Sequence, residues 1–223
     1  MWVDKVLGLF APAICKGCGV SGTGLCDSCR LEITEEPYAR CVVCSNLATT
    51  NNLCSVDAAS SPFARAFVVG KNSGTLKTLV YDYKLKPERA LARTLVQVLD
   101  DVLPILPSGV VVVPIPTIRT HVRQRGFGHT ELVAKLFAKR RKLKYRNLLA
   151  RTDNIVMHGL KKNERVKAAA QTFSCKGNPS YEEILLIDDI YTTGSTVTAA
   201  AKLLKESGVQ KINLVIIARQ EKK

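Results

Sequence analysis

The chain contains 223 residues, and 46% of them are apolar, which is enough for one medium-sized α/β domain and a small additional module. No segment approaches the run of about 20 apolar residues that a membrane-spanning helix requires, so a transmembrane protein is not expected. Lys and Arg outnumber Asp and Glu by 33 to 19, a formal net charge of +14. This excess indicates anionic partners, either a phosphorylated substrate or nucleic acid, unless the basic surface serves only solubility.

The N-terminal segment, residues 1–60, is predicted to contain a short helix and a cysteine-rich zinc module. Residues 1–14 are largely apolar but include Asp4 and Lys5, and they lack the basic start and small-residue cleavage site of a secretory signal. We therefore expect an amphipathic helix that packs on the rest of the chain, and a cytoplasmic protein. Seven of the eight cysteines precede residue 55, which in a cytoplasmic protein favours metal binding over a disulfide framework.

Two sets of residues in this segment have the spacing of zinc ligands. The first set contains two Cys-x-x-Cys motifs, whose four thiolates can surround one tetrahedral Zn²⁺: Cys15, Cys18, Cys26 and Cys29. The second set has an aspartate at the position of its fourth cysteine: Cys41, Cys44, Cys54 and Asp57. Aspartate is a weaker zinc ligand, so the second set either binds a second ion or has lost it. Reduced cysteines without a metal are the alternative for the first set.

The following α/β body, residues 61–223, alternates apolar strands with amphipathic helices. In chain order, strands are expected at 63–70, 109–115, 145–149, 184–187 and 211–218, and helices at 73–82, 88–103, 130–141 and 196–207. Two basic stretches, 83–86 and 119–127, are expected as loops, and 152–172 as an irregular hood or acceptor-side segment. This alternation predicts βαβ units and one parallel sheet flanked by helices.

One strand–loop–helix, residues 184–196, has the composition of a phosphoribosyl-binding site. Its strand ends at Asp188 and Asp189, and ligands of open parallel sheets bind at the carboxyl ends of strands. The loop that follows offers hydroxyl and N–H groups beside a helix N-terminus, a cradle for a monophosphate: Thr192, Thr193, Gly194, Ser195 and Thr196. Asp, Ser and Thr are also ordinary helix caps, but capping explains one or two of these residues and not their order.

Two basic segments are candidates for binding further anionic groups of a phosphorylated ligand. Lys84 follows the first strand–helix unit, and a second group follows the buried strand at 109–115: Arg119, His121, Arg123 and Arg125. A position directly after a buried strand favours a site, although a solvated basic loop is the alternative. Among the three histidines we prefer His121 as a ligand contact, because it lies among the arginines.

The 184–196 segment resembles the signature of type I phosphoribosyltransferases, which bind 5-phosphoribosyl-1-pyrophosphate (PRPP). Together with the cysteine module, the Val-Pro-Ile-Pro strand at 113–116 and the arginine segment, it makes the chain similar to the ComF family, phosphoribosyltransferase-like proteins linked to competence and DNA uptake. The resemblance implies a type I phosphoribosyltransferase fold, a structural zinc in the N-terminal module and an Mg²⁺–PRPP site. It also implies that Asp188 and Asp189 hold the ribose hydroxyls, and that the 192–196 loop holds the 5′-phosphate.

On the acceptor side the chain follows the family pattern only in part. The residues that match it before the last motif are Arg151, Thr152, Leu160, Arg165 and Phe173. Four residues differ from it at positions where an acceptor would bind: Gly128, His129, Met157 and Ala168. The resemblance therefore covers the PRPP side completely and leaves the acceptor unspecified.

These observations lead to two main functional hypotheses. In the first, the protein is an enzyme that transfers phosphoribosyl from Mg²⁺–PRPP to an acceptor, with Arg119 and the 192–196 loop binding PRPP and five catalytic residues: Asp188, Asp189, Lys84, Arg123 and Arg125. In the second, it is an accessory protein of DNA uptake that binds single-stranded DNA, with the PRPP site as a sensor or a relic. Only 6% of residues are aromatic, so phosphate contacts would dominate such binding. A metabolite-sensing transcription regulator ranks last, because no helix-turn-helix is evident.

Overall fold

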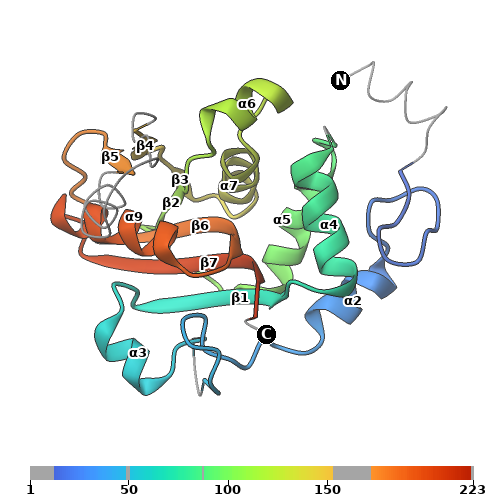
Figure 1. The fold of residues 1–223 in the computed structure, drawn as a ribbon, viewed down its shortest axis with the longest axis horizontal. Helices are drawn as coiled ribbons and strands as arrows, with labels where there is room; N and C mark the ends of the chain where they lie inside the picture. Colours follow the sequence, from blue (N-terminus) through green and yellow to red (C-terminus); the bar gives the residue numbers. More distant parts are fainter. Residues whose placement is uncertain (1–12, 49–50, 87, 153–171, 222–223) are drawn as a thin grey trace, which may run out of the picture.

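The computed structural model describes residues 13–48, 51–86, 88–152 and 172–221. Its centre is a sheet of five parallel strands (Figure 1), in the order β1 (Arg65–Lys71), β7 (Lys211–Arg219), β6 (Glu183–Tyr191), β2 (Val111–Pro114) and β3 (Lys144–Tyr145). A separate antiparallel pair joins β4 (Leu149–Arg151) to β5 (Phe173–Cys175). The parallel α/β sheet predicted from the sequence is confirmed.

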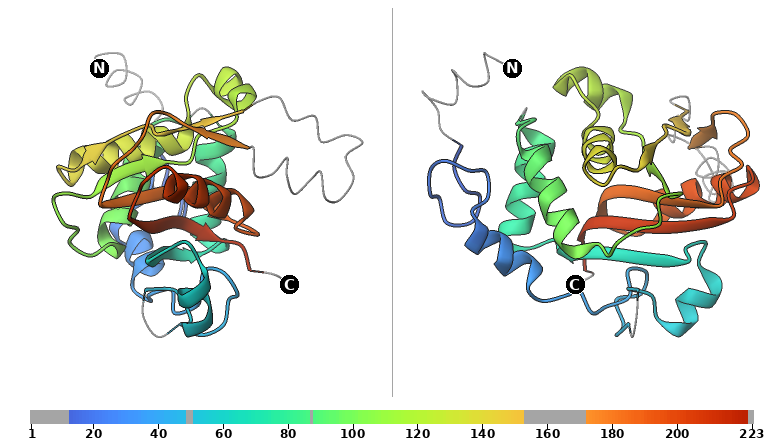
Figure 2. Two further views of the ribbon diagram at one scale, coloured as in Figure 1. Left: turned by 90° about the vertical axis from the view of Figure 1, so that its left-hand side faces the viewer. Right: turned by 180° about the vertical axis from the view of Figure 1, so that it is seen from behind.

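Helices cover both faces of this sheet (Figure 2). One face carries α4 (Gly74–Leu85), α5 (Leu91–Val102) and α7 (His129–Arg140), and the other carries α9 (Ser195–Glu206). Because both faces are covered, the central strands are apolar on both sides, which explains the continuous apolar runs in the sequence.

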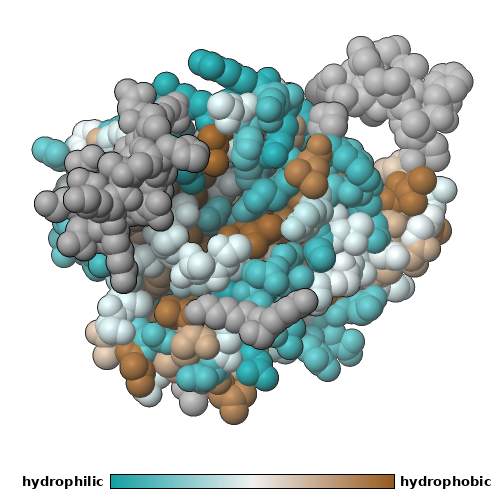
Figure 3. Space-filling model, in the orientation of Figure 1, coloured by the Kyte–Doolittle hydropathy of each residue, from teal (hydrophilic) through white to brown (hydrophobic). Residues whose placement is uncertain are grey.

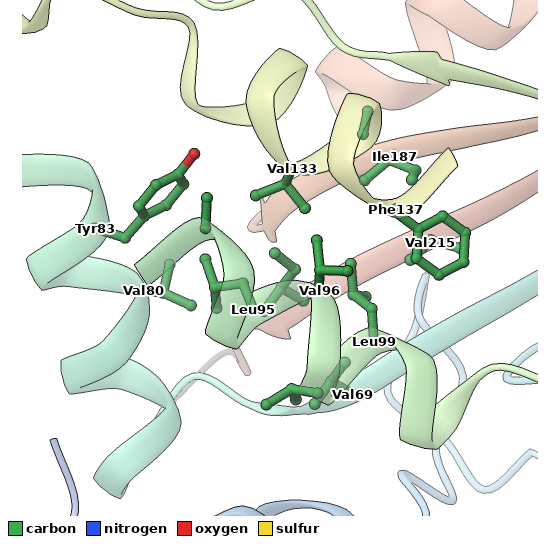
Figure 4. Packing of buried hydrophobic residues seen from close by; sticks show 14 of the residues in the cluster. Val69, Val80, Tyr83, Leu95, Val96, Leu99, Val133, Phe137, Ile187 and Val215 are labelled. Atoms are coloured by element: carbon green, nitrogen blue, oxygen red, sulfur yellow. The ribbon is translucent and has the colours of Figure 1, made fainter. Parts of the chain in front are cut away.

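Two hydrophobic cores result, one on each face of the sheet. Successive strand residues point to opposite faces, so Val215 of β7 belongs to the first core and Leu214 to the second. Figure 4 shows the first core, where Leu99 of α5 and Phe137 of α7 pack between their helices and the strands. Both of these side chains are fully buried.

The connections that follow β2 and β6 leave the sheet toward opposite faces. After β2 the chain continues through α6 (Arg119–Arg125) into α7, and after β6 it continues into α9. In an open parallel sheet this divergence leaves a crevice at the carboxyl ends of the two strands. Because β2 and β6 are neighbours, the crevice lies beside Asp188 and Asp189.

The first cysteine-rich segment lies beside α4 and α5 and leads into α2 (Asp27–Thr34). The Lys16 ammonium is 3.0 Å from the Asp82 carboxylate and 2.9 Å from that of Glu88. Cys15 and Cys29 join the first core, so this segment is packed onto the helices of the body.

The second cysteine-rich segment lies along β1, the strand at the edge of the sheet, and leads into α3 (Ser55–Ser60). The Ala66 N–H donates to the Asn51 carbonyl at 2.9 Å, and the Val68 N–H donates to the Asn52 side chain at 3.1 Å. These bonds occupy backbone donors that an edge strand would otherwise expose.

Several segments differ from the sequence-based expectation. Residues 83–85, expected in a loop, are the last turn of α4, because Tyr83 continues the buried stripe of that helix. Residues 119–125, also expected as a loop, form α6, and β6 continues beyond residue 187 to Tyr191, so both acids belong to the strand. The strand expected at 145–149 is divided into β3 and β4. The predicted N-terminal helix lies outside the described residues, as does most of 152–172.

None of the described helices is long and apolar enough to cross a bilayer. On the face shown in Figure 3, hydrophobic residues are interspersed among hydrophilic ones. The hydrophobic side chains are concentrated instead in the two cores.

Candidate functional site

A cavity of about 410 Å³ opens at the carboxyl ends of β2 and β6. Its walls come from both strand ends, from α4, α6 and β4, and from the first turns of α7 and α9. The charged and histidine side chains that line it are Asp188, Asp189, Lys84, His121, Arg125, His129 and Arg151. Three partly exposed apolar side chains also line it: Tyr81, Leu85 and Ile118. A lining with two carboxylates and several cations suits a ligand that carries both hydroxyl and phosphate groups.

Asp189 is the centre of a buried ion-pair network in this cavity. Its Oδ2 lies 2.7 Å from Nε2 of His129 and 3.0 Å from Nζ of Lys84. Its Oδ1 accepts a hydrogen bond from the Ile190 N–H at 2.6 Å. His129 is the first residue of α7 and is also buried, with its Nδ1 3.4 Å from the Thr117 hydroxyl. Lys84 and His129 thus hold Asp189 in one orientation.

The two adjacent acids have opposite pKa shifts. Burial disfavours ionisation of Asp189, but the hydrogen bond from His129 and the charge of Lys84 outweigh burial and hold the pKa of Asp189 below its usual range. Burial raises the pKa of Asp188, and the charge of Asp189 raises it further. The pair therefore presents one firmly ionised carboxylate and one carboxyl group that readily takes up a proton.

The loop between β6 and α9 has the geometry of a small anion site. Gly194, directly before α9, has a left-handed backbone (φ 78°), and a Cβ there would lie 1.9 Å from the Tyr191 hydroxyl, so the loop requires glycine. The hydroxyls of Thr193 and Ser195 are 3.1 Å apart, and Thr196 lines the cavity. The first N–H groups of a helix have no partner within it and attract anions.

Both cysteine-rich sets form clusters that could hold a metal ion. In each cluster the four ligand atoms lie within 4.8 Å of one another, in the first Cys15, Cys18, Cys26 and Cys29, and in the second Cys41, Cys44, Cys54 and Asp57. One sulfur pair in each cluster is 3.7 Å apart, Cys18 to Cys26 and Cys44 to Cys54. Sulfurs at about 2.3 Å from a tetrahedral zinc would be separated by about 3.8 Å, so these donor sets fit zinc.

The two clusters share one local structure. The residue after each first Cys-x-x-Cys motif has a positive φ, 80° at Gly19 and 65° at Ser45. In each cluster a helix begins directly after the third cysteine, α2 after Cys26 and α3 after Cys54. Asp57 thus takes the place of a fourth cysteine in an otherwise repeated arrangement.

Comparisons with known proteins find a matching domain and several similar proteins. A model of the phosphoribosyl transferase domain matches residues 135–223, the part that contains the acid pair and the loop. The chain is 27% identical to competence protein F of Haemophilus influenzae over 223 residues, which cover 92% of this chain and 95% of that protein. These matches support a ComF-family protein with a phosphoribosyltransferase fold. Other ComF relatives include competence protein ComFC of Bacillus subtilis, 35% identical over 44% of this chain and 39% of that protein. The DNA utilization protein YhgH of Escherichia coli O6:H1 is 24% identical over 88% of this chain and 97% of that protein.

Helix α6 divides the basic residues that the sequence placed in one site. His121 and Arg125 are four residues apart, so they share a helix face, and both line the main cavity. Arg119 and Arg123 share another face and line an adjoining cavity of about 350 Å³ with Arg151 and Lys176. Lys84 and Arg125 therefore lie with the acids, whereas the roles of Arg119 and Arg123 stay predictions for a neighbouring cavity.

His129 is the histidine in contact with Asp189, whereas the sequence favoured His121 as the histidine that touches the ligand. In the sequence, His129 stands out only as a departure from the usual ComF pattern, and His121 lines the same cavity. The position of His129 in the chain could have indicated its role, because His129 begins the helix that follows the β2 connection at the crevice. Of the other acceptor-side residues, Thr152 and Phe173 are described, while Met157, Leu160, Arg165 and Ala168 lie outside the described residues.

Proposed function

We propose that the chain binds Mg²⁺–PRPP in the crevice and transfers its phosphoribosyl group to an acceptor, with release of pyrophosphate. One observation carries the proposal: the acid pair and Thr196, the last residue of the 192–196 loop, line one cavity, and both belong to the segment that matches the phosphoribosyl transferase domain. The loop and the acids are consecutive along the chain, so a ribose 5′-phosphate can reach both. A cytoplasmic location is part of the proposal, since reduced cysteine clusters persist there.

In this proposal each group in the cavity has a separate role. The 192–196 loop binds the 5′-phosphate, and Asp188 and Asp189 accept hydrogen bonds from the ribose hydroxyls. Lys84 and Arg125 provide positive charge near the leaving pyrophosphate, with Arg119 and Arg123 reaching it from the adjoining cavity.

The reaction breaks the bond between ribose C1 and a pyrophosphate oxygen, which leaves with the electron pair. A nucleophilic atom of the acceptor then forms the new bond to C1. The negative charge of Asp189 stabilises positive charge that develops on the ribose. The cavity suits Mg²⁺, which prefers carboxylate and phosphate oxygens, and when bound it would neutralise charge on the departing pyrophosphate.

Calorimetric titration with PRPP and Mg²⁺ tests the binding step. The wild-type chain should bind, and the Asp188→Ala, Asp189→Ala double variant should lose binding while retaining its metal content. Glu206→Ala, an exposed acid at the far end of α9, serves as the matched control and should bind normally. Pyrophosphate release with a panel of nucleobases tests transfer. Absence of PRPP binding to the wild-type chain in the presence of Mg²⁺ would refute the proposal.

We also propose that both cysteine-rich clusters bind Zn²⁺. The repeated Cys-x-x-Cys turn and the sulfur–sulfur distance of 3.7 Å in each cluster support tetrahedral coordination of one ion per cluster. Metal analysis of the purified chain should give two zinc ions per chain, and Cys15→Ser should reduce the content by one. If the wild-type chain contained one zinc ion and Cys15→Ser lost it, zinc binding by the second cluster would be excluded. If the wild-type chain contained one zinc ion and Cys15→Ser retained it, zinc binding by the first cluster would be excluded.

A second candidate function is binding of single-stranded DNA in DNA uptake. The adjoining cavity favours it because it gathers four cations for phosphates: Arg119, Arg123, Arg151 and Lys176. The names of the relatives, competence proteins and a DNA utilization protein, support the same role. Binding through phosphates should weaken steeply with salt, and Arg123→Ala should lower that salt dependence. Tight DNA binding together with PRPP binding but no turnover would favour this candidate over transfer.

A further inference from the structure

Arg219, the last residue of β7, is a buried arginine that none of the roles above uses. Only 1% of it is exposed, although it is among the largest fully buried side chains of the described residues. Its guanidinium donates almost entirely to backbone carbonyls, and no carboxylate of the described residues forms an ion pair with it. A charged group held in this way is costly to bury, so its contacts point to a specific task.

The guanidinium joins two segments that are far apart in the sequence. On one side it donates to the second cysteine-rich segment, from Nε to the Val42 carbonyl at 2.6 Å and from a terminal nitrogen to the Val43 carbonyl at 3.2 Å. Both carbonyls lie between the cluster ligands Cys41 and Cys44. Any movement of this Cys-x-x-Cys turn therefore moves the partners of Arg219.

On the other side Arg219 holds the start of the candidate phosphate loop. It donates to the carbonyl of Thr192 at 3.0 Å and to that of Tyr191 at 3.3 Å. Its guanidinium also stacks on the Tyr191 ring, 4.6 Å from the ring centroid. That ring packs against Gly194, so Arg219 fixes both the backbone and the floor of the loop.

Charge supports the same connection. Three thiolates and one carboxylate around a divalent ion carry more negative than positive charge, and Arg219 is a buried cation beside that cluster. A metal ion that orders the second cluster thereby orders the carbonyls that receive the guanidinium.

We propose that Arg219 is a positioning residue that ties the 5′-phosphate loop to the second cysteine-rich cluster, so that a metal ion in this cluster maintains affinity for the 5′-phosphate. The inference rests on the proposed function for its ligand, but the link between cluster and loop is independent of it. The first cluster, packed on α4 and α5, is the internal control, because its described contacts do not include the loop.

Matched cysteine variants test the link. Cys18 and Cys44 are both exposed and occupy equivalent positions in the two clusters, so Cys18→Ala and Cys44→Ala should each remove one metal ion. Hydrogen exchange of the backbone amides at 191–196 should accelerate about tenfold in Cys44→Ala and stay unchanged in Cys18→Ala. Equal exchange in the two variants would overturn the proposal, whether or not PRPP binds.

Arg219→Lys tests the residue itself. Lysine keeps the charge but lacks the planar set of donors that reaches several carbonyls, so the affinity for ribose 5-phosphate should fall about tenfold. Inorganic pyrophosphate with Mg²⁺ is expected to bind without contacting the 192–196 loop, so its affinity should change by less than about twofold. A parallel loss for both ligands, or no loss for either, would overturn the positioning role. Failure of the wild-type chain to bind ribose 5-phosphate would instead contradict the proposed function, and the exchange experiment would still test Arg219→Lys.

Discussion

Replacing Gly194 with alanine tests the candidate phosphate loop at its most constrained point. Gly194 has φ 78°, and a left-handed backbone costs a non-glycine residue about 1–2 kcal/mol. The new Cβ would also lie 1.9 Å from the Tyr191 hydroxyl and 2.2 Å from the ring carbon that carries it. The Tyr191 ring would have to move by more than an ångström to restore normal contact.

That movement is opposed by Arg219, whose guanidinium stacks on the same ring. Overpacking of this kind costs about 1–3 kcal/mol, so the total for Gly194→Ala is about 2–5 kcal/mol. If the 192–196 loop relieves the strain by adopting a conformation that does not bind phosphate, about 2 kcal/mol of this strain energy appears as a loss of roughly 30-fold in affinity for PRPP.

Calorimetric titration with PRPP and Mg²⁺, together with thermal unfolding, measures both parts of the effect. Gly109→Ala is the control, because a Cβ at Gly109 meets no atom within 4 Å, and it should bind PRPP normally. In a Tyr191→Ala, Gly194→Ala double variant the collision is absent but the backbone strain remains, so Gly194→Ala should cost less stability in the Tyr191→Ala background than in the wild type. Wild-type affinity and stability in Gly194→Ala would refute the reasoning.

Three further changes have defined outcomes. Lys84→Met removes a partner that lowers the pKa of Asp189. A lowered carboxyl pKa contributes stability that is lost as pH falls, so the midpoint of acid unfolding should move to higher pH. The free energy of unfolding at pH 7 should fall by about 2 kcal/mol. The raised pKa of Asp188 costs stability as pH rises above the ordinary carboxyl pKa of about 4. Asp188→Asn should therefore unfold at a higher temperature than the wild type near pH 9. The difference in unfolding temperature should disappear near pH 4. Leu99→Ala empties a fully buried position between α5 and the sheet, and chemical denaturation should show a loss of about 2–5 kcal/mol. An unchanged acid midpoint, an Asp188→Asn effect that is largest at low pH, or a Leu99→Ala loss below about 1 kcal/mol would contradict these predictions.

The sequence predicted those features whose residues are adjacent or regularly spaced. The acid pair and the Gly194 loop follow one strand without interruption, and the ligands of both clusters lie within short Cys-x-x-Cys spacings. In such segments local geometry is decided by a few neighbouring residues, so the pattern determines the arrangement.

Features that depend on helix faces or distant contacts were not predictable in this way. Because 119–125 was expected as a loop, its basic residues were grouped together, whereas the helix separates Arg119 and Arg123 from His121 and Arg125. The sequence did not single out Arg219, which directly follows the strand expected at 211–218, and its partner Val42 lies 177 positions earlier in the chain. Backbone carbonyls exist at every residue, so no sequence pattern marks them as partners for a buried cation.

The hydrogen bonds between the second cysteine-rich segment and β1 have a consequence for self-association. A sheet edge with free N–H groups is a template for pairing with another chain, and here the Ala66 and Val68 donors are satisfied by Asn51 and Asn52. Since Asn51 and Asn52 lie three and two residues before the cluster residue Cys54, release of a metal ion from this cluster would loosen these hydrogen bonds and expose the edge of the sheet. Protein from which a chelator has removed the metal should therefore aggregate through β-strand pairing. A metal-loaded second cluster would then prevent self-association in addition to supporting the 192–196 loop.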